Sequence, residues 1–221
     1  MAVKLTDLGF VKGVIAECIV STYNANGKAT AAPKGVNIID DEHLIIDFFN
    51  TSATYANIRT HRCAAINLTS DIEVFYKTCF KEANPEEMPP QEWFENAKIV
   101  NAPKLRLADA AIEISIYNLE AVSAEKVRAS FKVRSLQSQE KYPQVYCRAF
   151  SATLEAIIHA TRVKEFLNGP NERKQVSKLL ELIDNCNCTV NRVAPNTVYS
   201  SVMADLTKRI DSWMIKTEKQ L

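Results

Sequence analysis

The first half of the chain alternates apolar and polar positions with a period of two, which is typical of β-strands. Between residues 108 and 121, isoleucine occupies every second position from 112 to 116, with polar residues between. The Asn26-Gly27 pair separates two such runs and is a strong signal for a β-hairpin. The pattern predicts strands over residues 14–23, 28–39, 43–49, 63–69, 108–121 and 125–136.

The period changes to that of a helix near residue 145. Apolar residues then recur at three- and four-residue steps, which predicts helices over residues 146–167, 172–188 and 196–217. The run Asn168-Gly169-Pro170 ends the first of them. Two short helices are expected earlier, one over residues 51–61 and one after Asp71, whose carboxylate suits a helix cap. A polar, proline-rich loop follows at residues 81–92.

These elements predict an α+β protein. Consecutive strands joined by tight turns favour antiparallel pairing, so we expect an antiparallel barrel or sheet of about six or seven strands. The helical layer comes after it in the chain. The change of period divides the sequence into a strand-rich domain, residues 1–145, and a helical subdomain, residues 146–221, which we expect to pack on the barrel or at a dimer interface.

Composition excludes several classes of protein. Of 221 residues, 47% are hydrophobic, which is enough for a proper core. The 27 basic and 26 acidic residues nearly cancel, which argues against a nucleic-acid-binding protein. No apolar run approaches the roughly 18 residues of a membrane helix. The first residues lack the apolar core of a signal peptide, so we expect a cytoplasmic protein with no membrane partner.

The cysteines and histidines give no metal motif. The one close cysteine pair, Cys186 and Cys188, has the wrong spacing for a zinc knuckle and no histidine nearby. His43, His61 and His159 show no ligand spacing, and we expect structural roles for them. We therefore predict no metal site, and the sequence shows neither a glycine-rich nucleotide loop nor a catalytic triad.

The turn after the third predicted strand is the strongest candidate site. It carries the hydroxyls of Thr51, Ser52 and Thr54, with Asn57 one turn further on. Hydroxyls at a strand-to-helix turn, together with the N–H groups of the helix, are suited to bind a phosphate. The alternative is that Thr51 or Ser52 caps the helix.

Two neighbouring segments add candidates. Pro33 and Gly35 interrupt a predicted strand, which indicates a bulge, a close backbone approach or an edge-strand irregularity. Ser21 and Thr22, at the end of the first strand, either line the same cleft or are solvent-facing strand residues.

The order of these segments resembles the FMN-binding split β-barrel, the fold of flavin reductases and pyridoxamine-phosphate-oxidase-like proteins. The resemblance is carried by residues 27–36, 44–49, 50–58 and 63–68, and it covers residues 14–80 well and the later strands loosely. Residues 17–23 (Glu-Cys-Ile-Val-Ser-Thr-Tyr), 148–150 (Arg-Ala-Phe) and 155–162 narrow it to a mostly archaeal branch known only as a domain of unknown function. It implies an antiparallel split β-barrel and a homodimer that holds FMN between its subunits.

The resemblance also assigns roles. It places Ala32, Pro33, Lys34 and Gly35 along the flavin ring and the hydroxyl turn at the phosphate. Many oxidase-like relatives have a lysine three residues before the helix asparagine, where this chain has Thr54. The phosphate then needs another cation, from Lys34, Arg59, Arg62 or Arg148, of which we favour Arg148; the alternative is a surface charge or an ion pair. The predicted cofactor-binding residues are Ser21, Thr22, Ala32, Pro33, Lys34, Gly35, Thr51, Ser52, Thr54, Asn57 and Arg148.

The predicted function is that of an FMN-binding flavoprotein. It would move hydride or electrons between a reduced nicotinamide or deazaflavin and a small acceptor. Because the flavin itself carries the electrons, the lack of an acid–base pair does not argue against catalysis, and nothing in the sequence demonstrates turnover. Two alternatives stay open: a non-catalytic carrier of FMN or a related phosphorylated heterocycle, and a cofactor-free dimeric interaction protein built on the apolar helix near residues 147–167.

Overall fold

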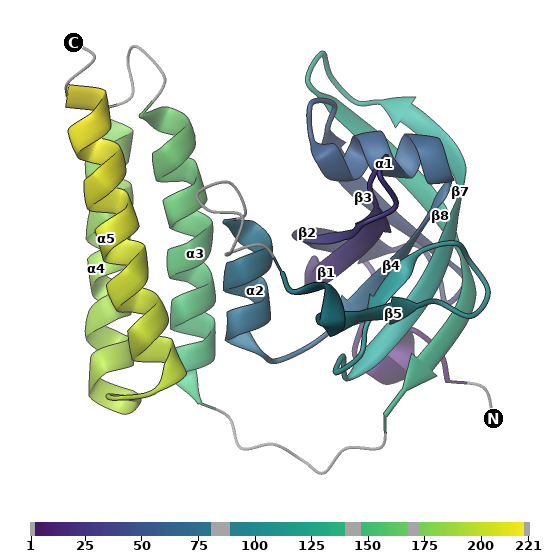
Figure 1. Ribbon diagram of the computed structural model, residues 1–221, viewed down its shortest axis with the longest axis horizontal. Coiled ribbons are helices and arrows are strands. Elements are labelled where there is room, and N and C mark those ends of the chain that lie inside the picture. Colours follow the sequence, from purple (N-terminus) through teal and green to yellow (C-terminus); the bar gives the residue numbers. More distant parts are fainter. Residues whose placement is uncertain (1–2, 81–88, 140–146, 168–172, 219–221) are drawn as a thin grey trace. The chain divides into compact units, whose positions relative to one another are not determined.

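The computed structural model describes residues 3–80, 89–139, 147–167 and 173–218. It divides into two compact units, each described by itself (Figure 1). The barrel unit contains Met1–Ser70 and Lys77–Tyr142, and the helical unit contains Asp71–Tyr76 and Pro143–Leu221. The expected helix stop at residues 168–170 and most of the expected loop at 81–92 lie outside the described residues.

Six antiparallel strands close the barrel in the order β1-β2-β3-β8-β7-β4. Their bounds fall within two residues of the prediction, which confirms the α+β class and the antiparallel barrel. The strands are β1 (Ala16–Tyr23), β2 (Ala29–Ile38), β3 (His43–Phe49), β4 (Cys63–Leu68), β7 (Ala110–Ala121) and β8 (Lys126–Ser138).

The first hairpin forms at the predicted Asn-Gly turn. Gly27 has a φ of 73°, a conformation that glycine adopts without steric cost. The Asn24 side chain accepts the backbone N–H groups of Asn26 and Lys28 at 2.9 and 3.0 Å. The turn thereby fixes the register that pairs Tyr23 with Ala29.

One pair of neighbouring strands in the barrel, β2 and β3, has few paired residues. β2 pairs with β3 only at Asn37 and Ile38. Residues 29–36 of β2 pair with β1 on one side and have no described strand partner on the other. Pro33 lies in this open edge, where its missing N–H costs no ladder hydrogen bond.

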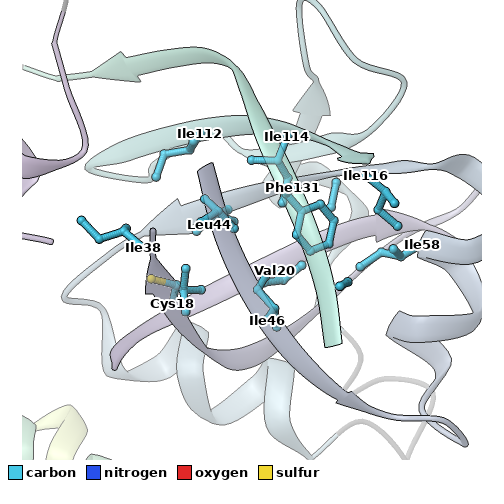
Figure 2. Close-up of a cluster of buried hydrophobic side chains, with 14 of the residues drawn as sticks. Cys18, Val20, Ile38, Leu44, Ile46, Ile58, Ile112, Ile114, Ile116 and Phe131 are labelled. Carbon is cyan, nitrogen blue, oxygen red and sulfur yellow. The ribbon is translucent and has the colours of Figure 1, made fainter. Parts of the chain in front are cut away.

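The barrel is filled by the alternating apolar residues that the sequence pattern predicts. Ile112, Ile114 and Phe131 are fully buried, and Ile58 reaches this cluster from helix α1 (Ala53–His61), as Figure 2 shows. α1 therefore contributes to the barrel core as well as following β3 in the chain.

A small two-stranded sheet was not predicted. β5 (Phe94–Asn96) pairs with β6 (Pro103–Leu105), following the short 3-10 helix η3 (Gln91–Trp93); another, η1 (Thr6–Leu8), lies near the start of the chain. Strands of three residues are too short to show an alternating pattern.

The helical unit is built from α3 (Arg148–Phe166), α4 (Arg173–Val193) and α5 (Val198–Glu218). Their buried residues include Ile157, Ile183 and Leu206, so the apolar face of α3 is covered within this unit. α4 continues past its predicted end at residue 188, because Val190 is fully buried.

Helix α2 (Ile72–Cys79) begins in the helical unit and ends in the barrel unit. The Asp71 carboxylate accepts the Glu73 N–H at 2.9 Å, as the sequence predicts. The Phe75 and Phe150 rings meet edge to face at 6.1 Å. Among the described residues, no helix is both long and apolar enough to span a membrane.

Candidate functional site

The amino end of α1 presents free hydroxyl groups. Ser52 caps the helix by accepting the Tyr55 N–H at 3.3 Å, so the capping role applies to this residue. A serine hydroxyl that accepts a bond still has its own proton to donate. Thr51 is exposed and Thr54 is buried, and neither hydroxyl bonds to another group in the described part of the chain. Unpaired helix N–H groups and hydroxyl donors thus occur in one short segment.

Asn57 connects this helix to the barrel. It is 9% exposed, and its Nδ2 donates to the Thr22 Oγ1 at 3.0 Å. Thr54 and Asn57 are three residues apart and share one face of α1. Three of the predicted residues, Thr22, Thr54 and Asn57, are therefore brought together between α1 and the end of β1.

Ser21 is engaged elsewhere. Alternation along β1 turns it to the opposite face from Thr22, and both residues are fully buried rather than solvent-facing. Its hydroxyl donates to the Pro103 carbonyl at 2.6 Å and accepts from the Asn67 Nδ2 at 2.9 Å. Asn67 in turn accepts the Leu105 N–H at 2.7 Å. This buried network joins β1 and β4 to β6.

Residues 32–35 are half-buried along the open edge of β2. The strand pairs with β1 without a slip in register, so the bulge considered at Pro33 and Gly35 is absent. The close approach is present: a Cβ on Gly35 would lie 2.7 Å from the Ile15 side chain. Burial lowers the pKa of Lys34, an effect that nearby Cys79 and Glu17 partly oppose.

The arginines that are candidates to neutralise the phosphate lie in different surroundings. Arg59 lies on α1, 5.7 Å from the centre of the Tyr55 ring. Arg62 ends α1 with a φ of 59°. Arg148 is the exposed first residue of α3 in the helical unit, and its role at the phosphate stays a prediction.

A cavity of about 530 Å³ lies at the other end of α1. It includes none of the predicted cofactor-binding residues. The side chains and backbone that line it are those of Tyr23, Gly27, His61, Asn96, Ala97, Val100, Asn101 and Ala102. Sequence reasoning missed it, because five of these residues belong to the unpatterned segment from Asn96 to Ala102.

Glu113 holds that segment in place. Its carboxylate accepts the N–H groups of Lys98, Ile99 and Val100 at 2.9, 2.6 and 3.0 Å. The side chain is 1% exposed, and a register shift in the pairing with β8 follows it directly. Such irregularities re-aim side chains. One acidic residue therefore fixes one wall of the cavity.

Comparison with known proteins places the chain in a family. Residues 16–155 match the family model described as the N-terminal domain of a protein of unknown function, DUF447. The chain belongs to the DUF447 family. This membership confirms the resemblance to a domain of unknown function that the sequence motifs indicated.

Two solved structures illustrate what this chain is similar to. An FMN-bound DUF447 protein from Methanosarcina mazei is 26% identical, with a TM-score of 0.73 over 92% of this chain and 98% of that one. Component B of a nitrilotriacetate monooxygenase from Bacillus cereus is 11% identical, with a TM-score of 0.52 over 68% of this chain and 88% of that one. The second likeness concerns the fold alone.

Proposed function

We propose that this protein binds FMN and transfers hydride or electrons through it to a small acceptor. The observation that carries the proposal is the amino end of α1, where the Thr51 and Thr54 hydroxyls make no hydrogen bond with the described chain. The proposal is supported by the similarity to the FMN-bound Methanosarcina mazei protein, which extends over nearly the whole length of both chains.

The donor set suits the phosphate group of FMN. That group carries close to two negative charges and takes N–H and O–H donors. The hydroxyls of Thr51, Ser52 and Thr54 and the first N–H groups of α1 supply such donors, and the helix dipole favours an anion there. Asn57 is tied to Thr22 and holds α1 in position against β1. For the cation that neutralises the phosphate, we keep the proposal made from the sequence, in which Arg148 is the favoured residue.

The open edge of β2 suits the flavin ring. The pyrimidine edge of the ring forms hydrogen bonds with backbone N–H and C=O groups. Residues 32–35 offer a stretch of backbone that has no strand partner on its outer side among the residues that the structure describes. At Gly35 this stretch runs close to the side chain of Ile15, which would have to shift to admit a Cβ. When bound, the flavin supplies the electron transfer, and the residues of this chain bind and orient it.

The proposal is tested with purified protein. We expect it to take up one FMN per chain, followed by absorbance near 450 nm, and the bound flavin to bleach rapidly in stopped flow with NADH, NADPH or reduced deazaflavin. A protein that takes up no FMN would overturn the proposal. If the protein takes up FMN but none of the three donors bleaches it, the result would favour the alternative of a non-catalytic FMN carrier. Sedimentation then tests the expected homodimer.

A matched pair of variants assigns the phosphate site. Thr54→Val removes the free hydroxyl at the amino end of α1 and keeps the shape of the side chain. Thr60→Val is the control, because Thr60 is exposed near the other end of the helix and, within the described residues, its hydroxyl bonds only to the Ala56 carbonyl, at 3.1 Å. We expect FMN affinity to fall about tenfold in the first variant, the effect of one lost charge-assisted hydrogen bond, and to be unchanged in the second.

A further inference from the structure

We propose that the cavity at the carboxyl end of α1 is a second binding site, which takes a small planar carboxylate. It is separate from the residues assigned to FMN. Its walls come from the end of α1, the β1–β2 hairpin and the segment that follows β5. Its volume of about 530 Å³ lies within the range of small-molecule sites in proteins.

His61 supplies the first reason. This residue lines the cavity, and its Nε2 atom is buried without a hydrogen-bond partner in the described part of the chain. Leaving a buried polar atom unpaired costs about 1–3 kcal/mol, so most such atoms in native proteins have partners. The Nε2 atom itself is closed to solvent, so a ligand in the cavity reaches it only when the imidazole turns toward the space that the ring already lines.

The side chains that line the cavity favour an anion, although the carboxyl end of the α1 dipole opposes one. No lining residue is acidic, and Arg59 and Arg62, which flank His61 in the chain near the end of α1, do not themselves line the cavity. None of these three residues forms an ion pair with the described part of the chain. The carboxylate of Glu113 lies behind the cavity wall, and three backbone N–H groups bind it. A ligand carboxylate would complete a charge-assisted hydrogen bond with the imidazole.

The remaining lining residues favour a flat ligand with polar edges. Gly27, Ala97 and Ala102 are small and let a ring approach the backbone. The hydroxyl of Tyr23 donates to Asn96 Oδ1 at 2.5 Å, which leaves the Asn96 amide N–H groups to donate to a ligand. The Tyr23 ring provides an apolar surface on which an aromatic ring stacks.

Benzoate is the probe for this site, and histidine NMR is the readout. The chain has only three histidines, so their ring signals are simple to follow. In flavin-free protein we expect benzoate to shift the His61 signal saturably, while the signals of His43 and His159 stay in place. We expect benzamide, which lacks the charge, and cyclohexanecarboxylate, which lacks the flat ring, to bind more weakly.

Three variants test the assignment. We expect His61→Asn to weaken benzoate binding about tenfold, measured by calorimetry. Asn101→Asp, at an exposed lining position, is expected to weaken it through charge repulsion without affecting the fold. His43→Asn is the control, because His43 lies on β3, does not line the cavity and pairs with Asp40.

The absence of a saturable His61 shift would overturn the proposal, as would equal benzoate affinity in wild type and His61→Asn. Displacement of benzoate by FMN would also overturn it, because the cavity would then belong to the flavin site. Because the titration uses flavin-free protein, failure of FMN binding leaves this result intact.

Discussion

Glu113→Ala tests how the wall of the cavity is held. The substitution removes the acceptor of three consecutive backbone N–H groups, from Lys98 to Val100. A buried donor left unpaired costs about 1–3 kcal/mol. Water reaches the outer side of this segment, where Ile99 is 62% exposed, and compensates for part of the loss. We therefore expect the unfolding free energy of the barrel unit to fall by about 3 kcal/mol, which is near the low end of the total for three unpaired donors.

Two readouts make this prediction specific. Urea unfolding followed by the fluorescence of Trp93, in a Trp213→Phe background, reports on the barrel unit. Amide hydrogen exchange at residues 98–100 reports on the segment itself, and we expect these amides to lose protection. Glu120→Ala is the control, since Glu120 is an exposed glutamate on the same strand. Full protection of the three amides in Glu113→Ala would refute the reasoning.

Other predictions concern titration and packing. Burial, with a smaller effect of nearby Glu17, raises the pKa of the Cys18 thiol to about 12, so Ellman's reagent at neutral pH should modify it only after unfolding. The bidentate bond from Arg128 lowers the pKa of Asp47. Because both side chains are well exposed, we expect Asp47→Asn to cost no more than about 1 kcal/mol at neutral pH. We expect urea unfolding to show this difference in unfolding free energy between wild type and Asp47→Asn shrinking as the pH falls below 3.8. It should be gone once the pH is below the lowered pKa of Asp47 in the folded protein. Tyr76→Phe removes the hydroxyl that donates to Asp205, and calorimetry should show the helical unit losing about 1 kcal/mol.

The strands and long helices were predictable because each carries its own periodic pattern. The isoleucines at 112, 114 and 116 are buried in the barrel core as their alternation predicts, although Glu113 between them is buried as well. The phosphate candidate was also visible in the sequence, because Thr54 and Asn57 are close in the chain and share a helix face. These features depend on local spacing alone.

The remaining features depend on partners far along the chain. Ser21 looked like a cleft residue, but its hydroxyl is bonded to the carbonyl of Pro103, in a three-residue strand without a pattern. Glu113 occupied an ordinary polar position between two isoleucines, and only the fold brings residues 98–100 to it. The cavity near His61 forms for the same reason, because the segment after β5 closes against the end of α1.

The most direct test of the central claim compares FMN with riboflavin, which lacks only the phosphate. If the amino end of α1 binds that group, the wild-type protein should bind FMN about a hundredfold more tightly, from two or more charge-assisted hydrogen bonds. Thr54→Val should lower this ratio about tenfold and leave riboflavin affinity unchanged. Equal affinity of the wild type for the two flavins, or a ratio that Thr54→Val does not alter, would contradict the account.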